Sequence, residues 1–100
     1  MRVIAKPTLD KFGAVHSLAK PSLDHSYEMA KAASWSSIQD VTDAFSKAKA
    51  LNDEPVRFEI KGGSYMLIVA FDFPRQIAFI KFVGTHAEYD KIDALTVSNF

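Results

Sequence analysis

The sequence predicts an α+β domain in which helices from the first half of the chain pack against a small antiparallel sheet from the second half. Apolar residues in the first half recur at helical spacing, and three later runs are rich in β-branched and aromatic residues. A Gly-Gly pair between the first two of these runs suits a hairpin turn. The expected order is β-α-α-α-β-β-β-α, with residues 1–100 forming one domain that ends in a short helix.

The first two expected elements are short. Residues 2–5 form a strand candidate, and Pro7 ends it because proline has no N–H to donate to a sheet. Thr8 is placed to cap a helix that carries Leu9 and Phe12 on one face. The chain is therefore expected to enter the helical half directly after one brief strand.

Two further helices are expected before the sheet. The first of them runs from about residue 22 to about residue 33. Ser37 and Asp40 fit a capping box at the start of the other, with a shorter acid in place of the usual Glu or Gln. Residues 48–55 are the expected loop, and the run Lys47-Ala48-Lys49 is interpreted as a solvated helix end. The single tryptophan of the chain is expected in the core.

The second half changes to the period of two that is typical of strands. Strands are expected at residues 56–60, 65–73 and 77–83. Gly62-Gly63 supplies the first turn between them, and Pro74-Arg75 supplies the second. Three adjacent strands joined by tight turns predict an antiparallel meander.

Hairpin geometry assigns the two faces of this meander. The first turn places Arg57 opposite Ile68 and Glu59 opposite Met66. The second turn places Lys81 opposite Ile68, so Arg57 and Lys81 would flank one strand at a separation of roughly 10 Å. The opposite face is the expected core and comprises Phe58, Ile60, Tyr65, Leu67, Val69, Phe71, Phe73, Ala78, Ile80 and Phe82.

Composition excludes several classes of function. The chain has no cysteine, which excludes disulfides, thiolate metal sites and cysteine nucleophiles. Its three histidines show no metal-ligand spacing, and we expect neither a metal nor a cofactor. No signal peptide or membrane-spanning run is found, which predicts a cytoplasmic protein. Lys+Arg and Asp+Glu number 12 each, so binding of nucleic acid would require a local basic patch.

The most informative stretch leaves the last predicted strand and reads Lys-Phe-Val-Gly-Thr-His-Ala-Glu-Tyr-Asp-Lys-Ile, from residue 81 to residue 92. It sets His86 and Tyr89 three residues apart, between Lys81 and Lys91. RNA cleavage without a metal needs a base for the 2′-hydroxyl, cations for the charge at phosphorus and an acid for the leaving oxygen. The stretch contains residue types suited to each of these tasks.

Three parts of the chain resemble a known family. The runs Val-Arg-Phe-Glu-Ile-Lys-Gly-Gly from residue 56 and Ile-Lys-Phe-Val-Gly-Thr-His-Ala-Glu-Tyr-Asp-Lys-Ile from residue 80 resemble the HigB toxin family. The middle segment with Ala33-Ser34-Trp35 and Ile38-Gln39-Asp40-Val41 is also similar to that family. The resemblance covers nearly the whole chain, and Thr-His-Ala-Glu-Tyr-Asp is its most specific part.

The resemblance implies a RelE-like fold and a type II toxin–antitoxin system. Such toxins are mRNA interferases, endoribonucleases that inhibit translation by cutting messenger RNA, often on the ribosome. The implied partner is a HigA-like antitoxin with a helix-turn-helix domain, which neutralises the toxin. The toxin–antitoxin complex would bind operator DNA through the antitoxin.

The residue chemistry assigns roles within this expectation. His86 would transfer protons because imidazole titrates near neutral pH, and Tyr89 would stack on a base or assist the proton transfer. A guanidinium binds phosphate through two N–H groups, whereas an ammonium acts as a point charge. The candidate catalytic residues are His86, Tyr89, Lys81 and Arg57, and the candidate RNA phosphate ligands are Lys61, Arg75 and Lys91.

Plainer roles compete with each of these assignments. His86 could simply bond a backbone carbonyl, and Tyr89 could be a half-buried packing residue. Arg57 and Glu59 could form an ordinary solvated strand face. A third interpretation of the whole chain is an unrelated α+β interaction domain whose C-terminal motif is only a helix cap.

Four positions depart from the pattern of the family. Glu59, Met66, Ala70 and Lys81 stand where the family commonly carries Asn, Arg, Lys and Arg. These changes remove positive charge from the expected RNA-binding face, which weakens phosphate binding. They support a second interpretation, a catalytically weakened toxin-fold protein that acts mainly as an antitoxin-binding subunit.

The same face carries unexpected apolar residues. Met66, Ile68 and Phe79 fall on the face opposite the core and would form an exposed apolar patch. An antitoxin segment laid on this patch would also cover the candidate active surface. The alternative is that the C-terminal helix or the N-terminal strand covers it.

Overall fold

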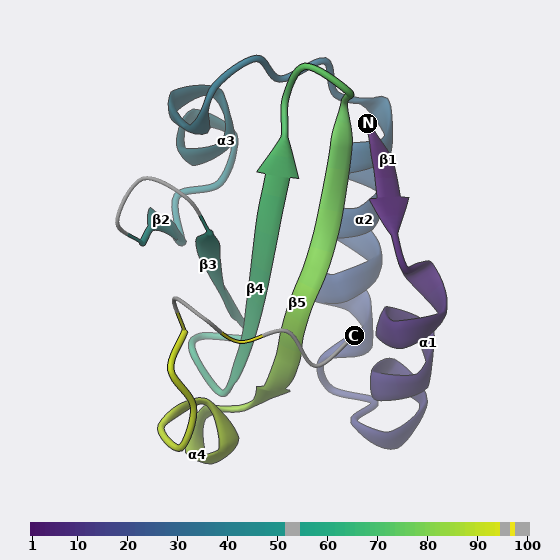
Figure 1. Cartoon of the computed structure of the whole chain (residues 1–100). Helices are drawn as coiled ribbons and strands as arrows, with labels where there is room; N and C mark the ends of the chain where they lie inside the picture. The colour runs from purple at the N-terminus through teal and green to yellow at the C-terminus, as the bar shows by residue number, and fades with distance from the viewer. Residues whose placement is uncertain (52–54, 95–96, 98–100) are drawn as a thin grey trace.

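The computed structural model describes residues 1–51, 55–94 and 97. Figure 1 shows helices on a central sheet, and the predicted α+β class is confirmed. The elements follow in the order β1 Arg2–Ile4, α1 Lys6–Val15, α2 Lys20–Ala32, α3 Ile38–Ala44, β2 Ala48–Ala50, β3 Val56–Ile60, β4 Tyr65–Asp72, β5 Ile77–Thr85 and α4 His86–Tyr89.

The five strands form one mixed sheet in the order β1-β5-β4-β3-β2. Strands β2 to β5 pair antiparallel with their neighbours, whereas β1 is parallel to β5. The expectation of a wholly antiparallel sheet is therefore wrong at β1. A parallel pair requires a long crossover between its strands, and three helices lie between β1 and the rest of the sheet.

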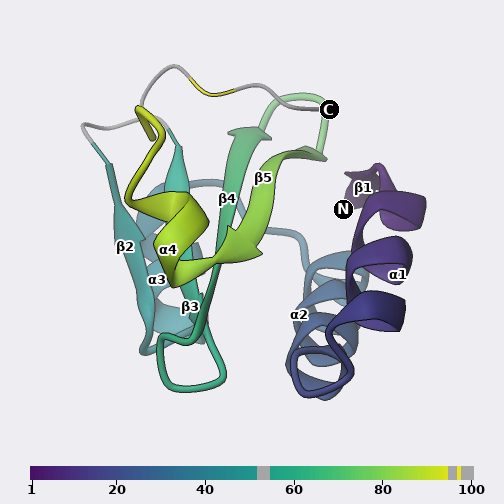
Figure 2. The same ribbon diagram turned by 90° about the horizontal axis from the view of Figure 1, so that it is seen from below.

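Helices α1 and α2 lie on one side of the sheet, and α2 is seen behind β5 and next to β1 in Figure 1. Figure 2 shows α4 apart from this pair, beside the hairpin that joins β3 to β4. The main core lies between the sheet and the helices. Its buried residues are Leu9, Ala19, Leu23, Val41, Val56, Phe58, Ile60, Leu67, Val69, Phe71, Ala78, Ile80 and Val83.

The predicted core face of the sheet is confirmed at every position except one. The predicted strand residues belong to this core or pack against it, apart from Phe82, which is buried on the other face. Trp35 also packs against the core, with its ring 5.9 Å from that of Phe45 and 6.0 Å from that of Phe71. The sequence pattern thus predicted which side of the sheet the helices cover.

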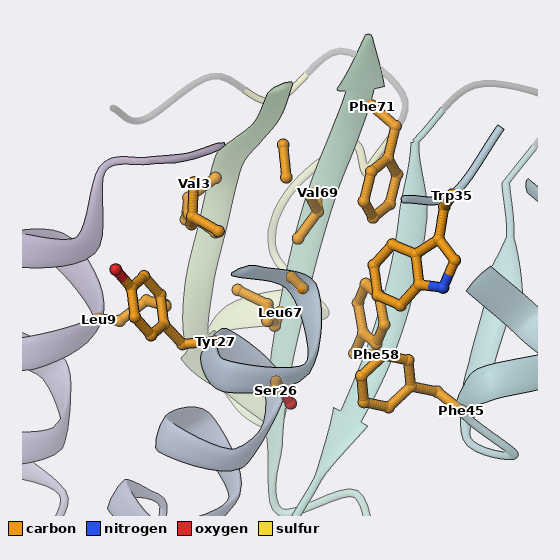
Figure 3. Close-up of a pocket in the computed structure, with 13 residues that line it drawn as sticks. Val3, Leu9, Ser26, Tyr27, Trp35, Phe45, Phe58, Leu67, Val69 and Phe71 are labelled. Carbon is orange, nitrogen blue, oxygen red and sulfur yellow. The ribbon is translucent and has the colours of Figure 1, made fainter. Parts of the chain in front are cut away.

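A small cavity of about 30 Å³ remains in the core, next to Trp35 and Phe58 (Figure 3). Its walls are apolar side chains apart from Ser26 and the ring of Tyr27. The Ser26 hydroxyl donates to the carbonyl oxygen of Ser22 at 2.9 Å, so it is already satisfied within α2. A space of this size holds about one water molecule, and we interpret it as a packing gap.

Two helices begin earlier than the sequence suggested. α1 begins at Lys6, and no side chain caps it, so the prediction that Thr8 caps this helix is wrong. α2 begins at Lys20 rather than near residue 22. Each helix carries proline in its first turn, where the missing N–H would have no helical partner in any case. None of the described helices has both the length and the apolar character that a membrane span requires.

Ser37 caps α3 as predicted, but the returning bond from Asp40 goes to Ser36 and not to the Ser37 amide, so the predicted capping box is only half formed. The Ser37 hydroxyl accepts a hydrogen bond from the Asp40 amide at 3.3 Å. The Asp40 carboxylate reaches back to the Ser36 amide at 2.9 Å and to the Ser36 hydroxyl at 3.1 Å. These bonds, led by the one from the Ser36 amide, lower the pKa of Asp40.

Residues 48–50 form strand β2, so the predicted loop is wrong there. Ala48, Lys49 and Ala50 pair with Phe58, Arg57 and Val56 of β3. Alanine and lysine are poor strand formers, and pairing with a buried neighbouring strand decides the conformation instead. Residues 52–54, also assigned to that loop, lie outside the described residues.

Candidate functional site

A β-bulge in β5 changes the register that the sequence predicted. Glu59 does pair with Met66, and Arg57 with Ile68, as expected. Val69 pairs with Ile80, but Ile68 pairs with Phe82, so Lys81 is the extra residue. The prediction that Lys81 lies opposite Ile68 is therefore wrong. The bulge also explains why Phe82 leaves the core and joins the outer face, which is defined here as the face that carries Arg57, Ile68 and Phe82.

The outer face is covered by the chain itself. Met66, Ile68 and Phe82 form a second buried cluster, and Ile68 is 0% exposed. The predicted exposed apolar patch is wrong for Met66 and Ile68, and the alternative of a covering C-terminal segment is the correct one. The residues that pack on this outer cluster are Tyr89, Ile92, Ala94 and Val97.

A complete capping box fixes α4 at the end of β5. The Thr85 hydroxyl accepts from the Glu88 amide at 3.2 Å, and the Glu88 carboxylate accepts from the Thr85 amide at 2.8 Å. The bond from the Thr85 amide is the main cause of a lowered pKa of Glu88. The box ties the first residue of α4, His86, to a defined position on the sheet.

His86 is anchored to the hairpin between β3 and β4. Its amide donates to the carbonyl oxygen of Ser64 at 3.0 Å. Its ring Nδ1 lies 3.1 Å from the carbonyl oxygen of Gly63, and its Nε2 lies 3.5 Å from Oδ1 of Asp90. Both ring nitrogens thus face oxygen acceptors, while the side chain remains 55% exposed.

This arrangement suits a proton donor. An imidazolium ion has two N–H groups and would donate to both Gly63 and Asp90. The Nδ1 contact fixes the orientation of the ring, and the longer, exposed contact leaves Nε2 accessible to a ligand. The alternative that His86 merely bonds a backbone carbonyl describes Nδ1 correctly, and the contact of Nε2 with Asp90 adds a second bond to it.

Tyr89 connects His86 to Arg57. Its ring centroid lies 6.3 Å from that of His86 and 6.4 Å from that of Phe82. The guanidinium carbon of Arg57 lies 5.8 Å from the Tyr89 centroid, within cation–π range. Tyr89 is therefore a packing residue that also sets the position of two candidate site residues.

Arg57 is held from two sides. Its Nη2 lies 3.8 Å from Oε1 of Glu59, a long and partly exposed ion pair. Its Nε is buried and has no hydrogen-bond partner among the described residues, although a buried N–H usually finds one. The side chain is 23% exposed, so the guanidinium is partly desolvated and keeps donors for a ligand.

Two of the remaining candidates, Lys81 and Arg75, make their contacts elsewhere. Lys81 places its Nζ 5.5 Å from the Phe79 ring, in a groove with Asp72. Arg75 pairs with Asp72 at 3.3 Å in the β4–β5 turn, at the end of the sheet away from α4 in Figure 1. Lys61 is exposed in the β3–β4 hairpin, and Lys91 is exposed just after α4.

Sequence reasoning did not assign two further residues of this region to the site. Asp90 is the partner of His86 Nε2, and its i,i+4 spacing from His86 on a helix could have indicated the contact. Lys49 pairs with Arg57 across β2 and β3, which the predicted loop concealed. Within the described residues no group of three or more His, Asp or Glu is arranged to hold a metal ion.

Glu88→Ala is expected to lower the free energy of unfolding by about 0.3–1 kcal/mol at pH 7, because an acid in the first turn of a helix stabilises it. The lowered pKa of Glu88 makes this stabilisation present above the pKa of the unfolded chain and lost as pH falls through the folded pKa. Urea titrations of both proteins should therefore converge in acid. Glu28→Ala in α2 is the control, and a difference that persists at low pH would contradict the account.

The comparison with known proteins agrees with this geometry. The class is the RelE-like toxic component of a toxin–antitoxin system, whose family model matches residues 19–92. The match covers most of the 100 residues, and the chain belongs to the HigB toxin family. It spans α2 to the residues just after α4 and so includes every candidate site residue. No curated protein matches the chain.

Proposed function

We propose that this protein is an mRNA interferase, a metal-independent endoribonuclease that inhibits translation by cleaving messenger RNA. The observation that carries the proposal is the row of His86, Tyr89 and Arg57, in which a fixed imidazole and a partly buried guanidinium are joined by one aromatic ring. Proton transfer and stabilisation of charge at phosphorus need these two groups within one site. Membership of a toxin family supports the same activity.

The residues would divide the reaction between them. The 2′-oxygen of the RNA bonds to phosphorus and releases its proton to solvent, while the bond from phosphorus to the 5′-oxygen breaks. The His86 imidazolium donates its Nε2 proton to the departing 5′-oxygen, and Arg57 stabilises the charge on the phosphoryl oxygens. Tyr89 holds both groups in position. The products are a 2′,3′-cyclic phosphate and a free 5′-hydroxyl.

The proposal extends to partners that a toxin of this family implies. A HigA-like antitoxin with a helix-turn-helix domain would neutralise the protein, and the pair would bind operator DNA through the antitoxin. Ribosome-bound messenger RNA is the proposed substrate, which places the activity in the cytoplasm. The described surface available to an antitoxin includes Val15 and Leu18, which are 78% and 65% exposed.

Induced expression of the wild-type protein is expected to arrest growth and to create new 5′ ends in messenger RNA. The purified protein should produce RNA fragments with 2′,3′-cyclic phosphate ends, at the same rate with and without a metal chelator. Loss of cleavage with the chelator would contradict metal independence. Undisturbed growth with intact transcripts would overturn the nuclease assignment.

A second candidate function is a weakened toxin that mainly binds its antitoxin. The ion pair between Glu59 and Arg57 favours it, because the carboxylate competes with phosphate for the guanidinium. The outer face of β4 also carries no charge and is covered by Tyr89 and the C-terminal residues. A harmless wild type that still co-purifies with a co-expressed antitoxin would support this function. Glu59→Gln should then raise RNA binding.

A further inference from the structure

Strand β2 and the residue before it bring two lysines beside Arg57 and Glu59. Lys49 and Arg57 are directly opposite each other, and opposite residues of an antiparallel pair point to the same face. Lys47 lies beside Glu59, since its carbonyl oxygen accepts from the Glu59 amide at 3.2 Å. Ala48, between the two lysines, packs against the main core on the other face. The register of β2 therefore places Lys49 on the outer face, and Lys47, the residue before β2, follows the same alternation opposite Glu59.

These lysines are available to a ligand. Both are exposed, and neither forms an ion pair within the part of the chain that the structure describes. Across the outer face of β2 and β3, Lys47, Lys49 and Arg57 are accompanied by one described carboxylate, that of Glu59. Among the described residues of these two strands and the position before β2, the basic groups on the outer face thus outnumber the acidic ones.

The neighbouring strand cannot provide a comparable surface. The outward residues of β4 are Met66, Ile68 and Ala70, which carry no charge, and the first two are buried beneath Tyr89 and the C-terminal residues. A negatively charged polymer bound at Arg57 could therefore contact further cations on the β2 side of Arg57 but not on the β4 side. Lys49 is one strand spacing from Arg57, about 4.8 Å, and Lys47 is two residues further along, about 7 Å.

We propose that Lys47 and Lys49 bind the sugar-phosphate backbone of single-stranded RNA as it leaves the cleavage site, with Lys49 contacting the phosphate next to the one at Arg57. This inference rests on the proposed function and assigns it a second binding surface. The row then runs from His86 through Tyr89 and Arg57 to the edge strand β2. Ammonium groups act as point charges, so this surface would bind the RNA backbone without distinguishing its base sequence.

RNA fits this surface better than an acidic protein segment does. Protein interfaces contain apolar and aromatic residues among their charges. The outward positions of β2 and β3 are Lys49, Arg57 and Glu59, and with Lys47 just before β2 all of them are charged. The exposed large apolar residues of the described chain, Val15 and Leu18, instead belong to α1 and the turn after it.

Binding of a 2′-O-methyl RNA oligonucleotide, which cannot be cleaved, tests the inference apart from catalysis. Fluorescence anisotropy should show that Lys47→Ala with Lys49→Ala raises the Kd about tenfold at 50 mM salt. The slope of log Kd against log salt should fall by about 1.4, or 0.7 for each lost phosphate contact. Lys49→Arg should bind as the wild type does.

Lys11→Ala with Lys31→Ala is the matched control, because these lysines lie on α1 and α2 and should leave the Kd unchanged. Circular dichroism would verify that every variant is folded. Unchanged affinity and salt slope in the β2 variant, or no RNA binding by the wild type, would overturn the inference. Loss of antitoxin binding with intact RNA binding would assign the surface to a protein partner instead.

The two proposals can fail separately. A wild type that binds the oligonucleotide through β2 but never cleaves RNA would leave the inference standing and overturn the nuclease assignment. If the wild type cleaves RNA but the β2 variant binds RNA normally, the nuclease assignment stands and the inference about Lys47 and Lys49 is overturned.

Discussion

His86→Gln is expected to lower the rate of RNA cleavage by about 100- to 10,000-fold, the range that general acid catalysis contributes. Glutamine can still donate to the Gly63 carbonyl, which His86 Nδ1 faces at 3.1 Å, but it cannot transfer a proton at neutral pH. The variant should fold normally and be harmless on induction. Single-turnover cleavage of a labelled RNA, together with mapped 5′ ends in cells, measures the effect.

The control for this substitution is His25→Gln in α2, a helix that packs on the other face of the sheet. It should leave cleavage unchanged. RNA affinity should also change little in His86→Gln, because the cations of the site remain. Cleavage by His86→Gln at the wild-type rate would reduce His86 to an anchor of the β3–β4 hairpin and remove the main support for the mechanism.

Ile68→Ala is expected to lower the free energy of unfolding by about 2–5 kcal/mol, the usual effect of such a truncation in a core. Ile68 is 0% exposed and lies at the centre of the outer cluster, with Tyr89, Ile92 and Val97 packed on it. A total stability of about 5–15 kcal/mol is typical, so the loss would be a large fraction of it. Urea denaturation of both proteins measures the difference.

Leu18→Ala provides the contrast, because Leu18 is exposed and its truncation should change stability by no more than about 0.5 kcal/mol. Ile68→Ala should also loosen Tyr89 and so reduce cleavage. A destabilisation of Ile68→Ala below 1 kcal/mol would show that the C-terminal residues do not pack firmly on the sheet in solution. The antitoxin patch predicted from sequence would then be open again.

The β3–β4 hairpin was predictable from sequence because its determinants are local. Two glycines at positive φ, 65° for Gly62 and 91° for Gly63, define the turn, and alternating apolar residues fix the register. The helix cap at Ser37 was predictable for the same reason. Residues close in sequence decide both features, so the pattern is sufficient.

The errors arose where distant parts of the chain decide the conformation. The bulge at Lys81 has no glycine or proline to mark it, and it moves Phe82 to the other face of the sheet. β2 is a three-residue strand of alanine and lysine that only its neighbour β3 explains. These two features change the site most. The bulge removes Lys81 from its predicted place near Arg57, and β2 places Lys49 beside Arg57.

The contacts of His86 show that the β3–β4 turn also holds a candidate site residue in place. The oxygen atoms that receive its amide and its Nδ1 belong to Ser64 and Gly63, more than twenty positions earlier in the chain. Gly63 itself has a φ of 91°, a left-handed conformation that residues with a Cβ rarely adopt. The orientation of the His86 imidazole thus depends on the backbone conformation of Gly63, which is distant in sequence. A substitution of Gly63 would therefore behave genetically as a change in the candidate site, although this residue has no side chain with which to contact RNA.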